Sequence, residues 1–339
     1  RFSMSKAAEL ANLIGNINAG GGGVNRNAII NGAMSVSQRG TSFADPSNDD
    51  YVLDRFIARK SNDGAVTITQ DSSAPSGFAN SLKVDVTTAD TSIGASQFSM
   101  VQHKIEAQNL QGLAFGTSDA KNFTISFYVK SNKTGTYAVN ITQSDNSSKQ
   151  ATLNYTIDSA NTWERKSVTF TGDTSGVIND DNGVGFSILW WLAAGSDFTS
   201  GSASATFQTY ANANAAAGQA VNLLDSTSNE WFITGVQFEI GQNPTSFEHE
   251  PFERTLLKCQ RYFNTHPAGS HHLHAFDYNG SSSMVKITFP TTMRSSPTMS
   301  ATNGQGTTSS DQQSIMGFTR IYDDVSSNYV STYTADAEL

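Results

Sequence analysis

The segment that most constrains the fold is 231–240, where apolar side chains recur at every second position. One predicted face carries Phe232, Thr234, Val236, Phe238 and Ile240, and the opposite face turns polar toward its end. Successive side chains of a strand point to opposite sides of a sheet, so this alternation is typical of a half-buried β-strand. Polar turns precede and follow the segment. We therefore predict the closing strand of a β-sandwich, paired with elements near the beginning of the domain.

Short alternating segments of the same kind recur along the chain, separated by turn clusters rich in Asn, Asp and Gly. A first strand is predicted within 25–38. The other predicted strands lie at 53–58, 65–70, 82–86, 98–105, 123–130, 137–142, 151–157, 163–170, 184–192 and 203–210. The clearest alternation predicts inward-facing side chains at Phe123, Ile125, Phe127 and Val129. Many short strands with almost no helix predict an all-β fold, a jelly-roll β-sandwich.

Helical spacing is confined to two short segments. The first, at 5–14, carries an apolar stripe and is expected to end at Gly15, before a glycine-rich tether. The second follows Pro251, which suits a first helical turn. The predicted organisation is a helix and tether at 1–24, a jelly roll at 25–241, a linker helix at 242–264, and a smaller C-terminal β-sandwich tip module at 265–339.

Two of these parts are expected to bury apolar surface against other copies of the chain. A helix as short as 5–14 is marginally stable by itself. The module at 265–339 is thin in apolar residues, and small domains bury a modest fraction of their surface. We therefore predict a homo-oligomer.

The composition excludes several classes of partner. Charged residues make up only 15% of the 339 residues, against about 25% in typical soluble domains. The net charge of −9 argues against nucleic acid, whose phosphates require clustered Lys and Arg. No apolar run approaches the roughly 20 residues of a membrane-spanning helix, so we expect no membrane insertion. The surface must instead be rich in hydroxyl and amide groups, which suits contact with sugars.

Several segments, in consistent order along nearly the whole chain, resemble tail-fibre and appendage proteins of marine bacteriophages, including those that infect cyanobacteria. The segments that carry the resemblance are 25–41, 51–56, 81–92, 161–166, 225–239, 247–249, 258–263 and 289–297. The resemblance implies a jelly roll similar to carbohydrate-binding modules, a homotrimeric fibre in the virion, and attachment to host surface glycans. It also implies that the N-terminal segment contacts other tail proteins.

No catalytic motif stands out in the sequence. There is no Gly-x-Ser-x-Gly elbow, no phosphate-binding glycine loop and no His-Glu-x-x-His. We therefore expect no enzymatic activity. Two alternatives remain: a glycan-degrading fibre enzyme, and a capsid decoration or spacer protein that binds no glycan.

Aromatic side chains are the candidates for stacking on the apolar faces of sugar rings. Trp190 shares a face with Phe186, Ile188 and Leu192 and is expected in the core, so Trp191 points away from it and is the better exposed candidate. The full set of glycan-binding candidates is Trp191, Trp163, Tyr128, Tyr210 and Tyr278. Receptor contacts are also expected in the loops at 278–283, 303–310 and 323–329. The alternative for each aromatic is a position in the core or in an interface.

The sequence contains candidate ligands for two kinds of metal site. His272 and His274 would lie on one side of a strand, and some trimeric phage fibres bind a transition metal with such a His-x-His from each chain. Asp180, Asp181 and Asp225 offer hard oxygens that suit Ca²⁺. The alternative interpretations are a polar loop for the histidines and turn residues for the aspartates.

Overall fold

The computed structural model describes residues 6–18, 26–145, 148–266, 273–305, 308–323 and 329–339. The chain divides into two compact units, Arg1–Glu250 and Pro251–Leu339. The division places the helix α4 (Phe252–Gln260) with the second unit, where Pro251 is its N-cap residue. Among the described residues, no helix is long and apolar enough to cross a membrane.

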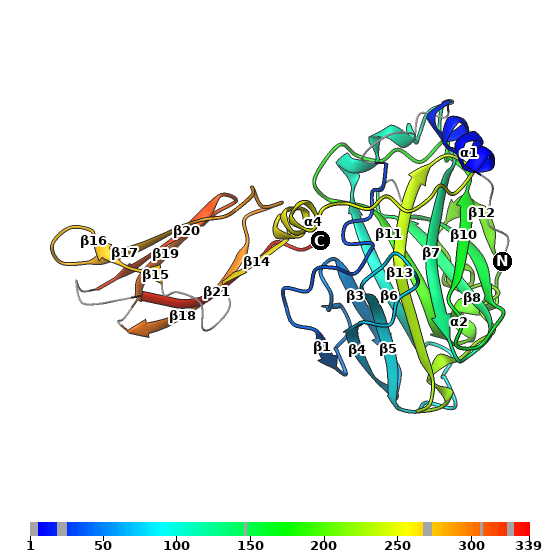
Figure 1. The fold of residues 1–339 in the computed structure, drawn as a ribbon, viewed down its shortest axis with the longest axis horizontal. Helices are drawn as coiled ribbons and strands as arrows, with labels where there is room; N and C mark the ends of the chain where they lie inside the picture. The colour runs from blue at the N-terminus through cyan, green and yellow to red at the C-terminus, as the bar shows by residue number, and fades with distance from the viewer. Residues whose placement is uncertain (1–5, 19–25, 146–147, 267–272, 306–307, 324–328) are drawn as a thin grey trace. The chain divides into compact units, whose positions relative to one another are not determined.

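The first unit contains two antiparallel sheets packed face to face (Figure 1). The six-stranded sheet has the order β1 (Ser42–Ala44), β4 (Ala65–Asp71), β5 (Ser81–Thr88), β13 (Glu230–Ile240), β7 (Phe123–Ser131) and β10 (Glu164–Phe170). The seven-stranded sheet has the order β12 (Ser204–Thr209), β9 (Lys149–Ile157), β8 (Gly135–Gln143), β11 (Val184–Ala194), β6 (Phe98–Glu106), β3 (Phe56–Ser61) and β2 (Asp50–Tyr51).

The chain passes repeatedly between these sheets, which makes the unit a jelly-roll sandwich as predicted. β5 and β7 lie in one sheet while β6 lies in the other, and β13 closes the first sheet between β5 and β7. The inner faces form one apolar core in which Phe123, Phe127, Trp190 and Trp231 are fully buried. The inward alternation predicted for 123–130 is confirmed, since its four apolar side chains belong to this core.

Short helices occupy the connections. They are η1 (Ala107–Leu113), α2 (Ser196–Thr199), α3 (Asn212–Ala215) and η2 (Leu223–Asp225). The N-terminal helix α1 spans Lys6–Asn18, so it does not end at Gly15 as predicted. A single glycine costs a helix only about 1 kcal/mol relative to alanine, which does not stop it.

The faces predicted for β13 are wrong in its first half, because a β-bulge interrupts the alternation. The pairing with β7 shifts between Thr234 and Gln237, and Gly235 has a φ of 60°. Trp231 and Ile233 therefore share the core with Val236 and Phe238, and Phe232 points to the outer side of the sheet. A glycine in the left-handed region is the usual residue at such a bulge, since it adds one position without a Cβ clash.

The first strand predicted within 25–38 is absent from the described residues 26–38. Asn31 and Met34 have positive φ angles of 62° and 55°, which breaks extended geometry. The segment nevertheless lies along the second half of β13: Ala28 N donates to Phe238 O at 3.2 Å, and Val236 N donates to Gly32 O at 2.9 Å. The expectation that β13 pairs near the beginning of the domain is thus confirmed.

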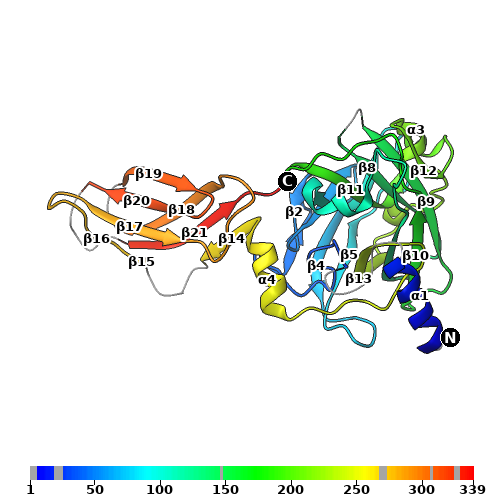
Figure 2. The same cartoon turned by 90° about the horizontal axis from the view of Figure 1, so that it is seen from above.

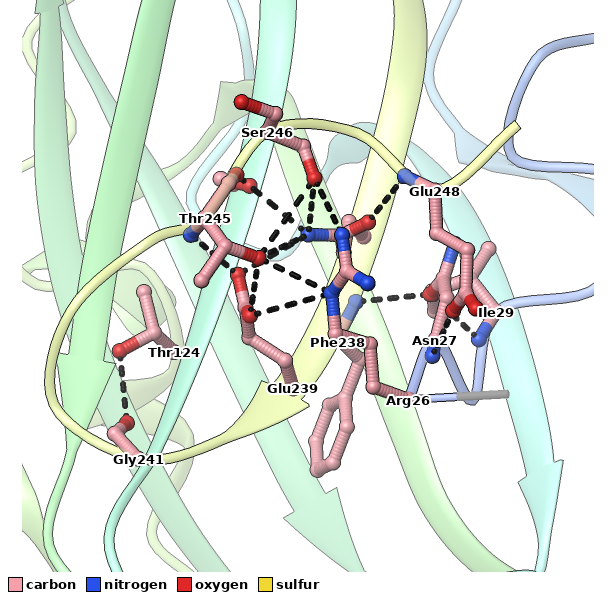
Figure 3. Close-up of polar contacts among 12 residues, drawn as sticks. Arg26, Asn27, Ile29, Thr124, Phe238, Glu239, Gly241, Thr245, Ser246 and Glu248 are labelled. Carbon is pink, nitrogen blue, oxygen red and sulfur yellow. Dashed lines mark hydrogen bonds and ion pairs between the residues drawn. The ribbon is translucent and has the colours of Figure 1, made fainter. Parts of the chain in front are cut away.

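A strap, residues 243–248, covers the outer face of β13 through a buried polar network (Figure 3). Its centre is Glu239, whose side chain is fully buried. The Glu239 carboxylate accepts from Thr245 N at 2.8 Å, from Thr245 Oγ1 at 2.7 Å and from Gln237 Nε2 at 3.0 Å. Arg26 Nη2 donates to Ser246 O at 2.7 Å, and Asn27 N donates to Glu248 at 3.1 Å. The strap therefore ties the exit of the unit to its entry.

The second unit is a smaller β-sandwich (Figure 2). One sheet has the order β14 (Phe263–His266), β21 (Tyr329–Asp336) and β15 (Leu273–His274), with β18 (Thr298–Gln305) also paired to β21. The other has the order β16 (Phe276–Asp277), β17 (Ser283–Thr288), β20 (Gly317–Tyr322) and β19 (Thr308–Ser314). Most of the predicted loop at 303–310 is strand, and its residues 306–307 lie outside the described part of the chain.

The second unit has an apolar core of its own. It includes Val285, Phe289, Phe318 and Tyr333, all buried. Ile315 and Met316 form the exposed turn between β19 and β20. Phe318 and Arg320, on β20 itself, are buried.

Candidate functional site

The outer face of the seven-stranded sheet carries a cleft of about 470 Å³. This volume lies within the roughly 300–1,000 Å³ of small-molecule sites. Its described lining residues are Arg59, Phe98, Met100, Gln102, Lys104, Asn140, Thr142, Gln143, Ser144, Ser148, Val184, Ser187, Leu189, Trp191, Phe198 and Tyr210. The set mixes aromatic, apolar and hydrogen-bonding side chains, and it contains no carboxylate among these described residues.

Strand alternation delivers these side chains to the cleft. On β6 the residues Met100, Gln102 and Lys104 face outward, and Val101 and Ile105 between them belong to the core. β11 behaves in the same way, since its inward positions include Trp190 and its outward positions line the cleft. Each of the two strands therefore supplies one set of side chains to the core and the alternate set to the cleft.

The strand register places the cleft residues in rows across the sheet. In one row Trp191 lies opposite Met100, which lies opposite Arg59 of β3. In the next row Leu189 lies opposite both Gln102 and Asn140. Side chains opposite one another in adjacent strands are in contact range. The rows thus build a continuous floor with alternating apolar and polar patches.

Buried hydrogen bonds hold the polar part of the floor in place. Asn140 Nδ2 donates to Thr152 Oγ1 at 2.8 Å, and Thr152 Oγ1 donates to Asn214 O at 2.8 Å. Gln143 Nε2 donates to the carbonyl oxygens of residues 176 and 177 at 3.0 and 2.9 Å. Side chains held in this way are organised before a ligand arrives, which reduces the entropic cost of binding.

Arg59 is also held at the edge of the cleft. Its Nη1 donates to Gln102 Oε1 at 3.0 Å, and its Nε donates to Asn48 Oδ1 at 3.1 Å. The same Nε lies 3.0 Å from Asp49 Oδ1. The side chain keeps 26% of its surface exposed, so the guanidinium is positioned but reachable.

Tyr210, directly after β12, lines the same cleft from the other end of the sheet. It is 41% exposed. Burial of the rest of the ring raises the pKa of its hydroxyl, and the positive charge of Arg59 acts in the opposite direction. The hydroxyl is therefore protonated at neutral pH and available both to donate and to accept a hydrogen bond.

The structure brings two of the five predicted aromatics to the cleft, Trp191 and Tyr210. Trp191 is only 3% exposed, so the expectation that it is exposed is wrong. The rings of Phe98 and Phe198 cover it at centroid distances of 6.2 and 5.3 Å. Trp190 is fully buried in the core, as predicted.

The other three predicted aromatics lie elsewhere. Trp163 and Tyr128 are half-buried on the outer side of the six-stranded sheet, where Trp163 packs on Phe232 at 6.1 Å and Tyr128 on Phe78 at 5.4 Å. Tyr278 belongs to the second unit and is 54% exposed. Of the predicted receptor loops, 278–283 is described in full, and residues 324–328 of the loop at 323–329 lie outside the described residues.

The histidine pair is described only in part. His272 lies outside the described residues, and His274 is exposed on β15 with its ring 5.7 Å from Tyr329. Within the described part of the chain, no group of three or more His, Cys, Asp or Glu side chains gathers where it could hold a metal. The transition-metal site stays a prediction.

Two of the three aspartates predicted for calcium, Asp180 and Asp181, lie in the bend before β11, and Asp225 is the last residue of η2. Asp181 Oδ1 accepts from Gly183 N at 2.8 Å, a hydrogen bond typical of a turn, and Asp180 beside it is exposed. Asp225 pairs with the Lys133 ammonium, and its other oxygen accepts from Asn229 Nδ2 at 2.7 Å. These contacts account for Asp181 and Asp225, and the calcium site stays a prediction.

Most of the cleft was missed by sequence reasoning. Arg59, Gln102 and Lys104 occupy the outward positions of strands whose location was predicted, so alternation identifies them as outward. Alternation does not say which outer face of a sandwich stays open. That information comes from the strap and from Phe78, which packs on Tyr128 on the outer face of the other sheet.

Comparisons with known proteins assign no family. No family model matches the chain, and no curated protein matches it. Among solved structures it is similar to an enzymatically active domain of tailspike protein 4 of bacteriophage CBA120, with 11% identity and a TM-score of 0.34 over 63% of this chain and 21% of that one. It is also similar to a putative sugar-binding protein of Bacteroides thetaiotaomicron, with 14% identity and a TM-score of 0.35 over 63% of this chain and 99% of that one.

A third similarity is to the family 11 carbohydrate-binding module of a Clostridium thermocellum cellulase, with 14% identity and a TM-score of 0.30 over 62% of this chain and 98% of that one. This chain therefore spans about a fifth of the tailspike chain and nearly all of the other two. Likenesses at these TM-scores carry no argument about function. The fold assignment stands on the two sheets, and the interpretation of the site stands on the cleft.

The chemistry of the cleft suits a flexible, hydroxyl-rich ligand. Phe98, Phe198 and Tyr210 keep part of their rings exposed and offer apolar surface for the C–H faces of sugar rings. Trp191, Leu189 and Met100 are buried and pack together as an apolar cluster with Phe98 and Phe198. Thr142, Ser144 and Ser148 are at least partly exposed, and their hydroxyls can donate to and accept from sugar hydroxyls. Along β6 the cleft extends from Phe98 to Lys104, roughly 20 Å at about 3.4 Å per residue, which is long enough for more than one sugar.

Proposed function

We propose that this chain is a bacteriophage tail-fibre subunit that attaches the virion to host cells by binding surface glycans in the cleft of the seven-stranded sheet. The observation that carries the proposal is the cleft itself, with an apolar and aromatic floor and fixed amide groups. The sequence resemblance to phage tail-fibre proteins and the hydroxyl-rich, weakly charged composition support it.

The proposed mechanism is multivalent, non-enzymatic adhesion. A homotrimer would present three clefts, one on each chain. Several weak sites that bind at the same time raise the avidity for a glycan-covered surface without new contacts. The N-terminal segment would join other tail proteins. The cleft holds no Asp or Glu among its described lining residues, so the paired carboxylates of glycoside hydrolysis are not found there.

The test is binding of the whole chain to an array of bacterial envelope glycans, followed by titration of the bound members. Tyr210→Ala removes an aromatic at the cleft that is 41% exposed, so it should weaken binding about tenfold with little loss of stability. Phe276→Ala removes an aromatic of the second unit that is 52% exposed and is not a binding candidate, so it is the matched control and should bind normally. Equal affinity of both variants would place the site elsewhere.

Two further measurements separate the alternatives. Release of reducing ends from a bound glycan would favour the glycan-degrading enzyme. A blank array at high protein concentration would favour the decoration or spacer protein.

A further inference from the structure

We infer that the cleft selects acidic polysaccharides, and this inference rests on the proposed glycan-binding function. Its described lining contains two cations, Arg59 and Lys104, and no Asp or Glu. The chain as a whole has the opposite balance, with 30 acidic and 21 basic residues. A local reversal of charge in a cleft focuses the field on ligands of the opposite sign.

The two cations occupy separate places along the cleft. Arg59 lies opposite Met100 in the pairing of β3 with β6, and Lys104 follows four residues later on β6. At about 3.4 Å per residue these positions are roughly 14 Å apart along the strand. They therefore face different sugar residues of one bound chain. A polysaccharide that repeats its acidic groups would meet both.

Arg59 is built to receive an anionic group. Contacts with Asn48, Gln102 and Asp49 engage its Nε and Nη1 atoms. Among the described residues, no hydrogen bond involves Nη2, which leaves part of the guanidinium fork for a ligand. A planar fork matches the two oxygens of a carboxylate or a sulfate, and such charge-assisted bonds are about twice as strong as neutral ones.

A neutral glycan would not need this arrangement. Thr142, Ser144 and Ser148 already offer hydroxyl donors and acceptors to sugar hydroxyls. Arg59 is half-buried, and its anionic partner Asp49 contacts only Nε, so a neutral ligand that covers Nη2 would remove water from that side of the guanidinium without replacing it. Loss of hydration around a charge is costly unless an opposite charge compensates it. The lining therefore favours a ligand that brings negative charge.

The experiment compares each glycan bound on the array with its neutralised form, made by carboxyl reduction or by desulfation. Polygalacturonate and its methyl ester serve as a defined pair. Full-length protein should bind the acidic form about tenfold more tightly at low salt, with the difference shrinking as ionic strength rises. The two neutralising reactions show whether a carboxylate or a sulfate is recognised.

Variants assign the effect to the two side chains. Arg59→Gln and Lys104→Gln should each weaken binding of the acidic form roughly fivefold, and their effects should multiply because the sites are well separated. Lys121→Gln makes the same change in net charge at a residue that does not line the cleft and should have no effect. Asp49→Asn should strengthen acidic binding, since it removes the anion that competes for Arg59.

The outcomes are distinct. Tighter binding of acidic forms that depends on Arg59 and Lys104 supports the inference. Neutral forms that bind equally well overturn it and leave glycan attachment standing. A protein that binds no glycan at all overturns both this inference and the proposed glycan-binding function. Arg59→Lys keeps the positive charge, so it shows whether weaker binding by Arg59→Gln comes from the lost charge or from misfolding.

Discussion

His103 shows at the scale of one residue how strongly the two faces of a strand differ. Its neighbours Gln102 and Lys104 line the cleft, and His103 is 1% exposed on the opposite side of β6. Its Nε2 lies 3.2 Å from Ile30 O, so this nitrogen carries the proton and donates it. Burial, together with the positive charge of Arg55, lowers the pKa of His103 to about 3.

This shift makes stability depend on pH. The unfolded chain binds a proton at His103 below its ordinary pKa of about 6.5, whereas the folded chain resists protonation down to about 3. Stability is therefore lost as the pH falls between these values. At pH 4.5 the expected loss is about 2–3 kcal/mol relative to pH 7, measured by urea unfolding.

His103→Gln tests the assignment. Glutamine can donate to the same carbonyl and carries no titratable group, so the variant should lose most of this pH dependence while remaining folded at pH 7. Identical pH profiles for the variant and the original chain would show that His103 is not the responsible group.

The strap 243–248 is the structural element that decides which outer face is open. It covers β13 of the six-stranded sheet through Glu239 and Thr245, and no such network covers the cleft face among the described residues. Because Glu239 is fully buried, its charge is tolerated only while its partners remain.

Glu239→Ala should therefore release the strap. Without the carboxylate, Thr245 N loses a hydrogen-bond acceptor and the Arg26 guanidinium loses an ion-pair partner. The free energy of unfolding should therefore fall by roughly 2–4 kcal/mol. Thermal unfolding measures the loss. Limited proteolysis with a glutamate-specific enzyme should show faster cleavage at Glu248 or Glu250.

The matched control is Asp158→Ala. Asp158 pairs with Lys166 but keeps 66% of its side chain exposed, so its loss should change neither stability nor proteolysis noticeably. Equal effects of the two substitutions would mean that the network of Figure 3 does not hold the strap.

At the scale of the whole molecule, each unit has its own apolar core, and the proposed trimer must use surfaces outside them. Leu10 and Ile14 of α1 are 57% and 48% exposed. Exposed apolar residues a turn apart on one helix suit a helix–helix contact between copies.

We predict that Leu10→Glu combined with Ile14→Glu converts a trimer to monomers at micromolar concentration, measured by light scattering. Charged side chains in an apolar contact would lose hydration without a partner. Val177→Glu is the control, since Val177 is 51% exposed but lies outside the helix. A stable monomer in the unmodified chain would contradict the trimer itself.

Local patterns were sufficient for the secondary structure and much of the core. Alternation located nearly every strand of the first unit and assigned Phe127 and Trp190 to the interior, because burial on one side imposes a period of two. Alternation also predicted that Trp190 points into the core and that Trp191 points away from it. Local patterns could not show that Phe98 and Phe198 cover Trp191, since those rings come from other elements.

Only the tertiary structure decided the remaining features. The bulge at Gly235 reverses the faces of β13 because pairing with β7 shifts by one residue, and pairing is a long-range contact. The same applies to the site: both sheets offer polar outer faces, and the covering of one by the strap leaves the other as the cleft. Sequence alternation determines which side chains leave the core, and packing between distant segments determines which of them a ligand can reach.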